Sequence, residues 1–189
     1  MILPLNLSRQ TDEQLMARAA NDNGRAFEEL YNRYARRLQG FFYRQLGQDR
    51  ELAADYTHDT FLRLYDARRT YRRERPFSTW LFTVAYNLCR NRYRHMQTEA
   101  EVLIQLDSQP YDSDDIELQM DQKTLDSALR HVLEGLDAHL QLLFSLRYEE
   151  DLTVPQIAEI TAVPEGTVKS RLHKLMNMIK KKLKQYENH

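Results

Sequence analysis

The stretch Leu152–Leu175, LTVPQIAEITAVPEGTVKSRLHKL, predicts two short helices joined by a tight turn. Thr153 and Gln156 have the spacing of a capping box, in which each side chain satisfies a free backbone group at a helix start. Pro155 falls in the first helical turn, where its missing N–H is tolerated. Pro164 suits the start of the second helix, because its fixed φ already matches a helix.

The second helix of this stretch has one apolar face and one polar face. The apolar residues recur at helical spacing and are expected to face inward: Val168, Leu172, Leu175 and Ile179. The polar face carries Lys169, Ser170, His173 and Lys174, with Arg171 near the boundary. A helix with a buried stripe and a basic, polar outer face is suited to the major groove of DNA. The alternative is an ordinary helical hairpin with a solvated basic face.

The length of 189 residues allows one large domain or two small ones, and the composition fits an all-α protein. Apolar residues make up 42% of the chain and mostly recur at helical spacing, and there are only five Gly and five Pro. Cys89 is the single cysteine, so an intrachain disulfide is excluded. No signal peptide and no apolar run of about 20 residues is present, so we expect a cytoplasmic protein without membrane insertion.

Charge divides the chain into three blocks. Residues 1–96 hold 17 Arg, no Lys and 11 acids, which gives a net charge of +6. Residues 97–124 hold one Lys and eight acids, giving −7, and residues 125–189 hold nine of each, giving zero. We therefore predict a first domain over 1–96, a flexible acidic linker over 97–123 and a second domain over 124–189.

Residues 51–65, ELAADYTHDTFLRLY, predict a helix with two unlike faces. One face is formed by Leu52, Tyr56, Thr60 and Leu64. The other face combines charge with an exposed apolar side chain and contains Asp55, His58, Asp59 and Leu62. An exposed face of this kind is a fair surface for docking another protein, although a solvated face is the alternative.

The most basic stretch is residues 67–76, ARRTYRRERP, in which five arginines surround Tyr71. Guanidinium groups beside an aromatic ring suit phosphates and stacked bases, and Pro76 favours a loop. The helix predicted over 77–96 continues this pattern with Trp80, Asn87 and three arginines in its C-terminal half. The amide of Asn87 in an apolar helix is suited to hydrogen bonding a base edge.

Together, the segments 55–94 and 152–175 resemble the extracytoplasmic-function (ECF) sigma factors of the bacterial sigma-70 family. The most specific segments are DTFLRLY at 59–65, FSTWLFTVAYN at 77–87, and LTVPQIAEI with PEGTVKSRL. The resemblance implies a sigma region 2 helical bundle and a sigma region 4 helix-turn-helix. It also implies a transcription initiation factor without cofactor, metal or catalytic residue of its own.

The resemblance assigns three groups of residues. Those implied to bind core RNA polymerase are Asp55, His58, Asp59, Phe61 and Leu62. Those implied to recognise and melt the −10 promoter element are Tyr71, Arg72, Arg75, Trp80, Asn87, Arg90 and Arg94. Those implied to read the −35 element are Thr167, Lys169, Ser170, Arg171, His173 and Lys174. The implied partners are the clamp of the polymerase's largest subunit, the flap of its second largest subunit, promoter DNA and an anti-sigma factor.

Three other classes of function are open at this point. A stand-alone helix-turn-helix repressor or activator explains the C-terminal hairpin but leaves the arginine-rich loop, Trp80 and Asn87 without a role. An adaptor built of helical hairpins predicts no salt-dependent DNA binding. An enzyme is a poor fit, because Cys89 lies in an apolar helix and the histidines show no metal-ligand spacing with it.

Overall fold

The computed structural model describes residues 7–106 and 125–187, and within them it contains helices and turns but no strand. The all-α prediction is therefore confirmed for this part of the chain. The elements are η1 (Leu7–Arg9), α1 (Asp12–Ala19), α2 (Gly24–Gln45), α3 (Arg50–Asp66), η2 (Arg68–Thr70), α4 (Phe77–Leu106), α5 (Leu125–Glu134), α6 (Ala138–Phe144), the π-helical turn η3 (Ser145–Glu149), α7 (Val154–Thr161) and α8 (Glu165–Glu187).

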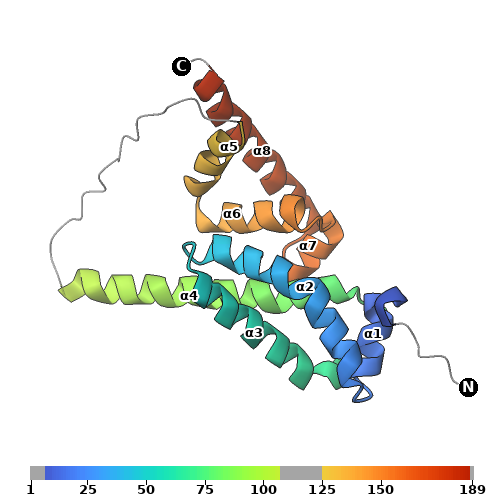
Figure 1. The fold of residues 1–189 in the computed structure, drawn as a ribbon. Coiled ribbons are helices and arrows are strands. Elements are labelled where there is room, and N and C mark those ends of the chain that lie inside the picture. The colour runs from blue at the N-terminus through green and yellow to red at the C-terminus, as the bar shows by residue number, and fades with distance from the viewer. Residues whose placement is uncertain (1–6, 107–124, 188–189) are drawn as a thin grey trace, which may run out of the picture.

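The helices form two bundles that touch. Helices α1 to α4 make the N-terminal module (residues 7–106), and α5 to α8 make the C-terminal module (residues 125–187); α6 and α7 lie against α2 and α4 (Figure 1). Buried side chains of both modules join in one hydrophobic cluster, which includes Phe41 and Phe82 from the first and Leu146 and Ile157 from the second. The modules are therefore packed together in this structure.

Local capping signals fix several helix starts. The predicted capping box is present, since the Thr153 hydroxyl and the Gln156 side chain accept each other's backbone N–H groups, and Thr11 and Gln14 form a second one at the start of α1. The turn between α7 and α8 follows from the left-handed conformation of Ala162, whose φ is 55°. The predicted stripe of α8 is buried as expected, with Leu175 fully enclosed. The helix-turn-helix of 152–175 is thus confirmed.

Helix α4 extends ten residues beyond the predicted domain boundary at Met96 and ends at Leu106. Residues 97–106, QTEAEVLIQL, contain good helix formers and neither Gly nor Pro, which explains the continuation. The predicted acidic linker therefore begins inside a helix. The rest of it, 107–123, lies outside the described residues.

The burial of two aromatic side chains in the N-terminal module cannot be predicted from the spacing of apolar residues alone. Tyr31 on α2 is 40% exposed and packs its ring against Phe61. Tyr93, in contrast, reaches inward from α4, and its hydroxyl donates to the backbone oxygen of Gln45 at 2.7 Å. This bond ties the end of α2 to the middle of α4.

Candidate polymerase and DNA interfaces

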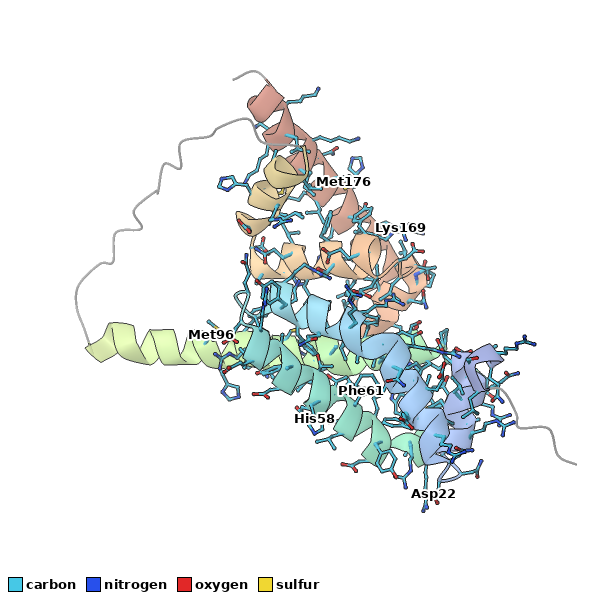
Figure 2. All side chains as sticks on the ribbon, in the orientation of Figure 1. Asp22, His58, Phe61, Met96, Lys169 and Met176 are labelled. Atoms are coloured by element: carbon cyan, nitrogen blue, oxygen red, sulfur yellow. The ribbon has the colours of Figure 1, made fainter. Side chains whose placement is uncertain are left out.

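The outward face of α3 carries an acidic and apolar surface, here called the docking face: Asp55, His58, Asp59 and Leu62. Asp55, His58 and Leu62 are exposed, and the side chain of Leu62 is 49% accessible. Asp59 pairs with Arg63 one turn along, at 3.0 Å. In the view of Figure 2, His58 lies on the side of α3 that faces away from the C-terminal module.

Phe61 does not belong to this exposed surface. Its side chain is only 3% exposed and packs edge-on against the ring of Phe27, at a centroid distance of 6.0 Å. The α3 helix turns Phe61 inward because it lies one residue before Leu62, which is about 100° away around the helix. Phe61 therefore supports the docking face from beneath and presents little surface of its own.

Residues 67–76 form the arginine loop, but only some of its five guanidinium groups are free to meet a ligand. Arg68 and Arg69 both pair with the carboxylate of Asp22, at 2.7 and 2.8 Å, and Arg68 also lies over the ring of Tyr65. These two arginines lower the pKa of Asp22, which keeps that carboxylate ionised. Arg72 and Arg73 are exposed.

A surface cavity of about 790 Å³ opens beside the arginine loop, and it is lined by Thr70, Tyr71, Arg72, Glu74, Arg75, Pro76, Trp80 and Glu159. The rings of Tyr71 and Trp80 lie 5.1 Å apart on one wall. Burial raises the pKa of the Tyr71 hydroxyl, which stays protonated and donates to the Arg75 carbonyl at 2.6 Å. A cavity with aromatic walls and cationic edges suits an unstacked base and its phosphate.

Arg75 connects this cavity to the other module. Its Nη2 donates to the Thr83 hydroxyl at 2.7 Å, and its Nε lies 2.5 Å from a carboxylate oxygen of Glu159 on α7. The Nε lacks an aligned acceptor, so the second contact is a charge pair and not a directed hydrogen bond. Farther along α4, Asn87 is half-buried and Arg90 and Arg94 are exposed.

The outer face of α8 presents most of the predicted reading residues to solvent. Lys169, Ser170, His173 and Lys174 are exposed, and Thr167 is half-buried. Their contacts in this structure stay within the helix: the Ser170 hydroxyl donates to the Thr167 carbonyl at 3.0 Å, and Lys169 lies 3.7 Å from Glu165. Such weak local contacts are easily exchanged for contacts with DNA.

Arg171 differs from its neighbours on α8. It is half-buried beside a small cavity that is also lined by Tyr86 of α4, and its guanidinium lies 2.9 Å from Nε2 of His139 on α6. Since a guanidinium only donates, this Nε2 must be the unprotonated acceptor. Burial and the charge of Arg171 both lower the pKa of His139, consistent with a neutral ring.

The residues that join the two modules could not be predicted from the sequence. Glu150, whose side chain is 3% exposed, pairs with Arg37 at 3.1 Å and Arg44 at 3.6 Å, both on α2. Gln45 donates to the Ser145 hydroxyl at 3.1 Å, and Gln156 donates to the Thr79 hydroxyl at 3.1 Å. Partners separated by 77 to 113 residues leave no periodic signal that a reader of the sequence could use.

Cys89 has the environment of a core residue. It is fully buried on α4, and burial raises the pKa of its thiol to about 12. Across residues 7–106 and 125–187, no cluster of His, Cys, Asp and Glu has the arrangement of a metal site. In the same described ranges, no helix is long and apolar enough to span a membrane.

Two family models match the chain, in the order of its two modules. Residues 30–98 match Sigma-70 region 2, and residues 126–178 match Sigma-70 region 4. The first match contains the docking face, the arginine loop and most of α4. The second match contains α7 and the exposed residues of α8.

Curated relatives and solved structures agree with these matches over most of the chain. The chain is 28% identical to the ECF RNA polymerase sigma-E factor of Haemophilus influenzae, covering 92% of this chain and 95% of the relative. It is 26% identical to the RNA polymerase sigma-H factor of Pseudomonas aeruginosa, and the match covers 94% of this chain and 96% of the relative. Its fold is similar to that of CnrH in complex with the cytosolic domain of CnrY, with a TM-score of 0.68 at 22% identity. This match covers 93% of this chain and 99% of the CnrH chain. The sigma factor RpoE of Bartonella quintana, in complex with the anti-sigma factor NepR, gives a TM-score of 0.63 at 20% identity. This match covers 84% of this chain and 96% of the RpoE chain.

Proposed function

Because the chain belongs to the sigma-70 family and to its extracytoplasmic-function type, we propose that it binds core RNA polymerase and directs it to specific promoters. The observation that carries this function is the presence of both family regions, in order, on a fold that exposes a docking face and a basic recognition helix. The chain itself is then a specificity subunit and not an enzyme. It works where polymerase works, in the cytoplasm.

We assign polymerase binding to the docking face of α3. Asp55, His58 and Leu62 are exposed there, and Asp59 is held only by an ion pair with an exposed arginine. An acidic rim around an exposed leucine suits a basic partner surface with an apolar centre. By resemblance, this partner is the clamp of the largest polymerase subunit, while the C-terminal module meets the flap of the second largest.

We assign the −10 element to the cavity at the arginine loop. Tyr71 and Trp80 offer rings for a base that has left the duplex, and Arg72 and Arg75 offer charge for its phosphates. Asn87, Arg90 and Arg94 extend this surface along α4. Melting is favoured because the captured strand is no longer available to pair with its complement.

We assign the −35 element to the exposed face of α8. Lys169, Ser170, His173 and Lys174 point outward, with Thr167 at the edge, and each good bidentate base contact contributes about 1–3 kcal/mol of discrimination. Arg171 joins them only if it leaves His139. Two weak DNA-binding modules on one scaffold gain affinity because the second contact becomes intramolecular.

We further propose control by an anti-sigma factor. The support is the similarity in fold to CnrH, whose solved structure is a complex with the cytosolic domain of CnrY, and to RpoE of Bartonella quintana, whose solved structure is a complex with the anti-sigma factor NepR. A partner that covers the docking face or holds the modules together would block initiation.

The test is reconstitution with core RNA polymerase, followed by sequencing of the transcription start sites. We expect the complex to initiate at promoters that core polymerase alone does not use, and the free chain to show almost no specific duplex binding. Unaltered start sites would refute the proposal. Tight, specific binding of the free chain to a promoter would favour a stand-alone repressor instead.

A further inference from the structure

The turn between α1 and α2 contains an aspartate that binds the arginine loop from outside. We propose that Asp22 is a positioning residue for the −10 element: its carboxylate fixes the first part of the loop and thereby keeps Tyr71 and Trp80 in place to receive an unpaired base. This role rests on the proposed function, because it concerns the cavity to which we assign the −10 element. Asp22 itself lies outside the residues that line that cavity.

Asp22 occupies a backbone position at which glycine is the usual residue. Its φ is 63°, in the left-handed region. The Asp22 N–H donates to the Ala19 carbonyl at 3.0 Å and the Asn23 N–H donates to the Arg18 carbonyl at 3.1 Å, which are the two bonds of a Schellman motif at the end of α1. Glycine is favoured at the left-handed position of this motif because it has no Cβ. An aspartate is less favourable for the turn itself, so the role of Asp22 lies in its side chain.

The Asp22 carboxylate binds both arginines at the start of the loop. One oxygen lies 2.7 Å from Nη2 of Arg68, and the other lies 2.8 Å from Nη2 of Arg69. Arg68 also donates from Nη1 to the Tyr65 carbonyl at 2.8 Å, near the end of α3. Figure 2 shows Asp22 at the turn between α1 and α2, beside this end of α3. One carboxylate therefore joins the turn, the end of α3 and the short helix η2.

The segment held by Asp22 leads directly to the aromatic wall of the cavity. Tyr71 follows η2, and its N–H donates to the Arg68 carbonyl at 3.4 Å. The centroid of the Tyr71 ring lies 5.1 Å from that of Trp80 and 6.4 Å from that of Phe77. Because Asp22 fixes Arg68, it also fixes Tyr71 against Trp80 before DNA arrives. A preorganised loop loses less conformational freedom on binding, so capture of an unpaired base is more favourable.

Helix α1 also holds the far end of the loop. A carboxylate oxygen of Glu13 accepts the N–H of Phe77 at 3.1 Å, and Phe77 is the first residue of α4. The loop is therefore attached at one end to α1 and at the other to the turn that follows α1. A substitution of Asp22 leaves the Glu13 attachment intact, so it should loosen the start of the loop without unfolding α4.

The first test uses Trp80, the single tryptophan of the chain, as a probe in the free protein. Asp22→Gly removes the carboxylate but suits the left-handed turn. We expect the unfolding temperature to stay the same or rise, while the emission of Trp80 shifts to longer wavelength and acrylamide quenches it more strongly. A purely structural role would instead lower the unfolding temperature together with these changes. Unchanged Trp80 fluorescence would overturn the proposal.

The second test measures promoter opening by the complex of the chain with core polymerase. Permanganate detects unpaired thymines, and the promoter is one found by sequencing of the start sites. We expect Asp22→Gly to slow opening about two- to fivefold, the range for loss of exposed ion pairs, while the initial binding of the promoter stays unchanged. Asp22→Asn tolerates the left-handed turn but lacks the charge, and it should slow opening as well.

The same titrations separate this role from a simpler one, in which Asp22 only withholds two arginines from the phosphates of DNA. In that case Asp22→Gly would bind the promoter more tightly and with a steeper dependence on salt, because freed arginines contact phosphates. Tighter, more salt-dependent binding with an unchanged rate of opening would refute the positioning role.

A cycle of substitutions shows whether Asp22 acts through its two arginines. In a chain that already carries Arg68→Ala/Arg69→Ala, Asp22→Gly should have no further effect on opening or on the fluorescence of Trp80. An undiminished effect in this background would contradict the proposal.

The matched control is Asp151→Gly in the C-terminal module. Asp151 also has a positive φ, 54°, but its side chain is 99% exposed and lies 4.0 Å from Arg147, far from the arginine loop in sequence. This variant should leave both the fluorescence of Trp80 and the rate of opening unchanged. Equal slowing by Asp151→Gly would show that the effect of Asp22→Gly is not specific to the loop.

The two proposals fail separately. A chain whose Trp80 fluorescence responds to Asp22→Gly, but which never directs polymerase to a promoter, refutes the sigma function. A chain that directs initiation, and whose Asp22→Gly variant opens promoters at the normal rate, refutes the role of Asp22.

Discussion

Leu62 offers the most direct test of the docking face. It lies on the exposed face of α3, and its side chain is 49% accessible while its neighbour Phe61 is buried. We consider Leu62→Ala, which removes apolar surface but should leave the bundle intact. A helix accepts Ala readily, so the free energy of unfolding should change little.

The expected loss of affinity follows from the exposed fraction of the side chain. Complete burial of a leucine contributes about 1.5–3 kcal/mol. Since Leu62 has about half of its surface left to bury, its contact with polymerase is worth about 0.7–1.5 kcal/mol. The dissociation constant for core polymerase should therefore rise about three- to twelvefold.

The assay is a titration of labelled chain with core polymerase, combined with thermal unfolding of the free variant. Met96→Ala is the matched control, because Met96 is also 49% exposed but lies on α4, outside the docking face. The reasoning is refuted if Leu62→Ala binds polymerase as tightly as the unchanged chain, or if Met96→Ala weakens binding equally.

Four further predictions concern the other surfaces. Asp59→Arg should reverse the charge of the docking face and abolish polymerase binding in a pull-down, while circular dichroism stays unchanged. Lys169→Ala should weaken holoenzyme binding to the −35 element by about 1–3 kcal/mol in a promoter titration and leave polymerase binding intact. Thr153→Ala removes the cap of α7 and should lower the free energy of unfolding by about 1 kcal/mol in urea titrations. The folded-state pKa of His139 is lowered from 6.5, so its contribution to stability is present above pH 6.5 and is lost as the pH falls through the lowered value. The decrease in unfolding temperature from pH 7.5 to 5.5 should accordingly be smaller for His139→Gln, and equal decreases would contradict this assignment.

Local signals predicted the C-terminal half of the fold well. Thr153 and Gln156 lie three residues apart, and the bonds they make depend on neighbouring backbone alone, so the sequence contains all that is needed to place the start of α7. The apolar stripe of α8 is likewise a property of one helix. The end of α4 was predicted less well, because the acidic composition after Met96 suggested a linker where helix propensity in fact continues to Leu106.

Interactions between distant segments account for what the sequence did not predict. The arginine loop looked uniformly available, but Asp22 binds Arg68 and Arg69 from 46 and 47 residues away. Phe61 shares a helix with the docking face, and its burial follows from the positions of Phe27 and Tyr31 on α2. The assignment of individual residues to polymerase or DNA stays a prediction, since a free chain shows which surfaces are exposed and not what they bind.

The π-helical turn at Ser145–Glu149 sets the direction in which the residues after it point around the helix axis. In an α-helix, residues five apart point about 140° away from each other, which would carry Glu150 far around from Ser145. The wider turn brings Glu150 back above Ser145, where its N–H reaches the Ser145 carbonyl at 2.9 Å. The π-helical turn therefore inserts one residue into the helix. Deleting one residue here would rotate Glu149 and Glu150 away from α2 without removing any charge from the chain.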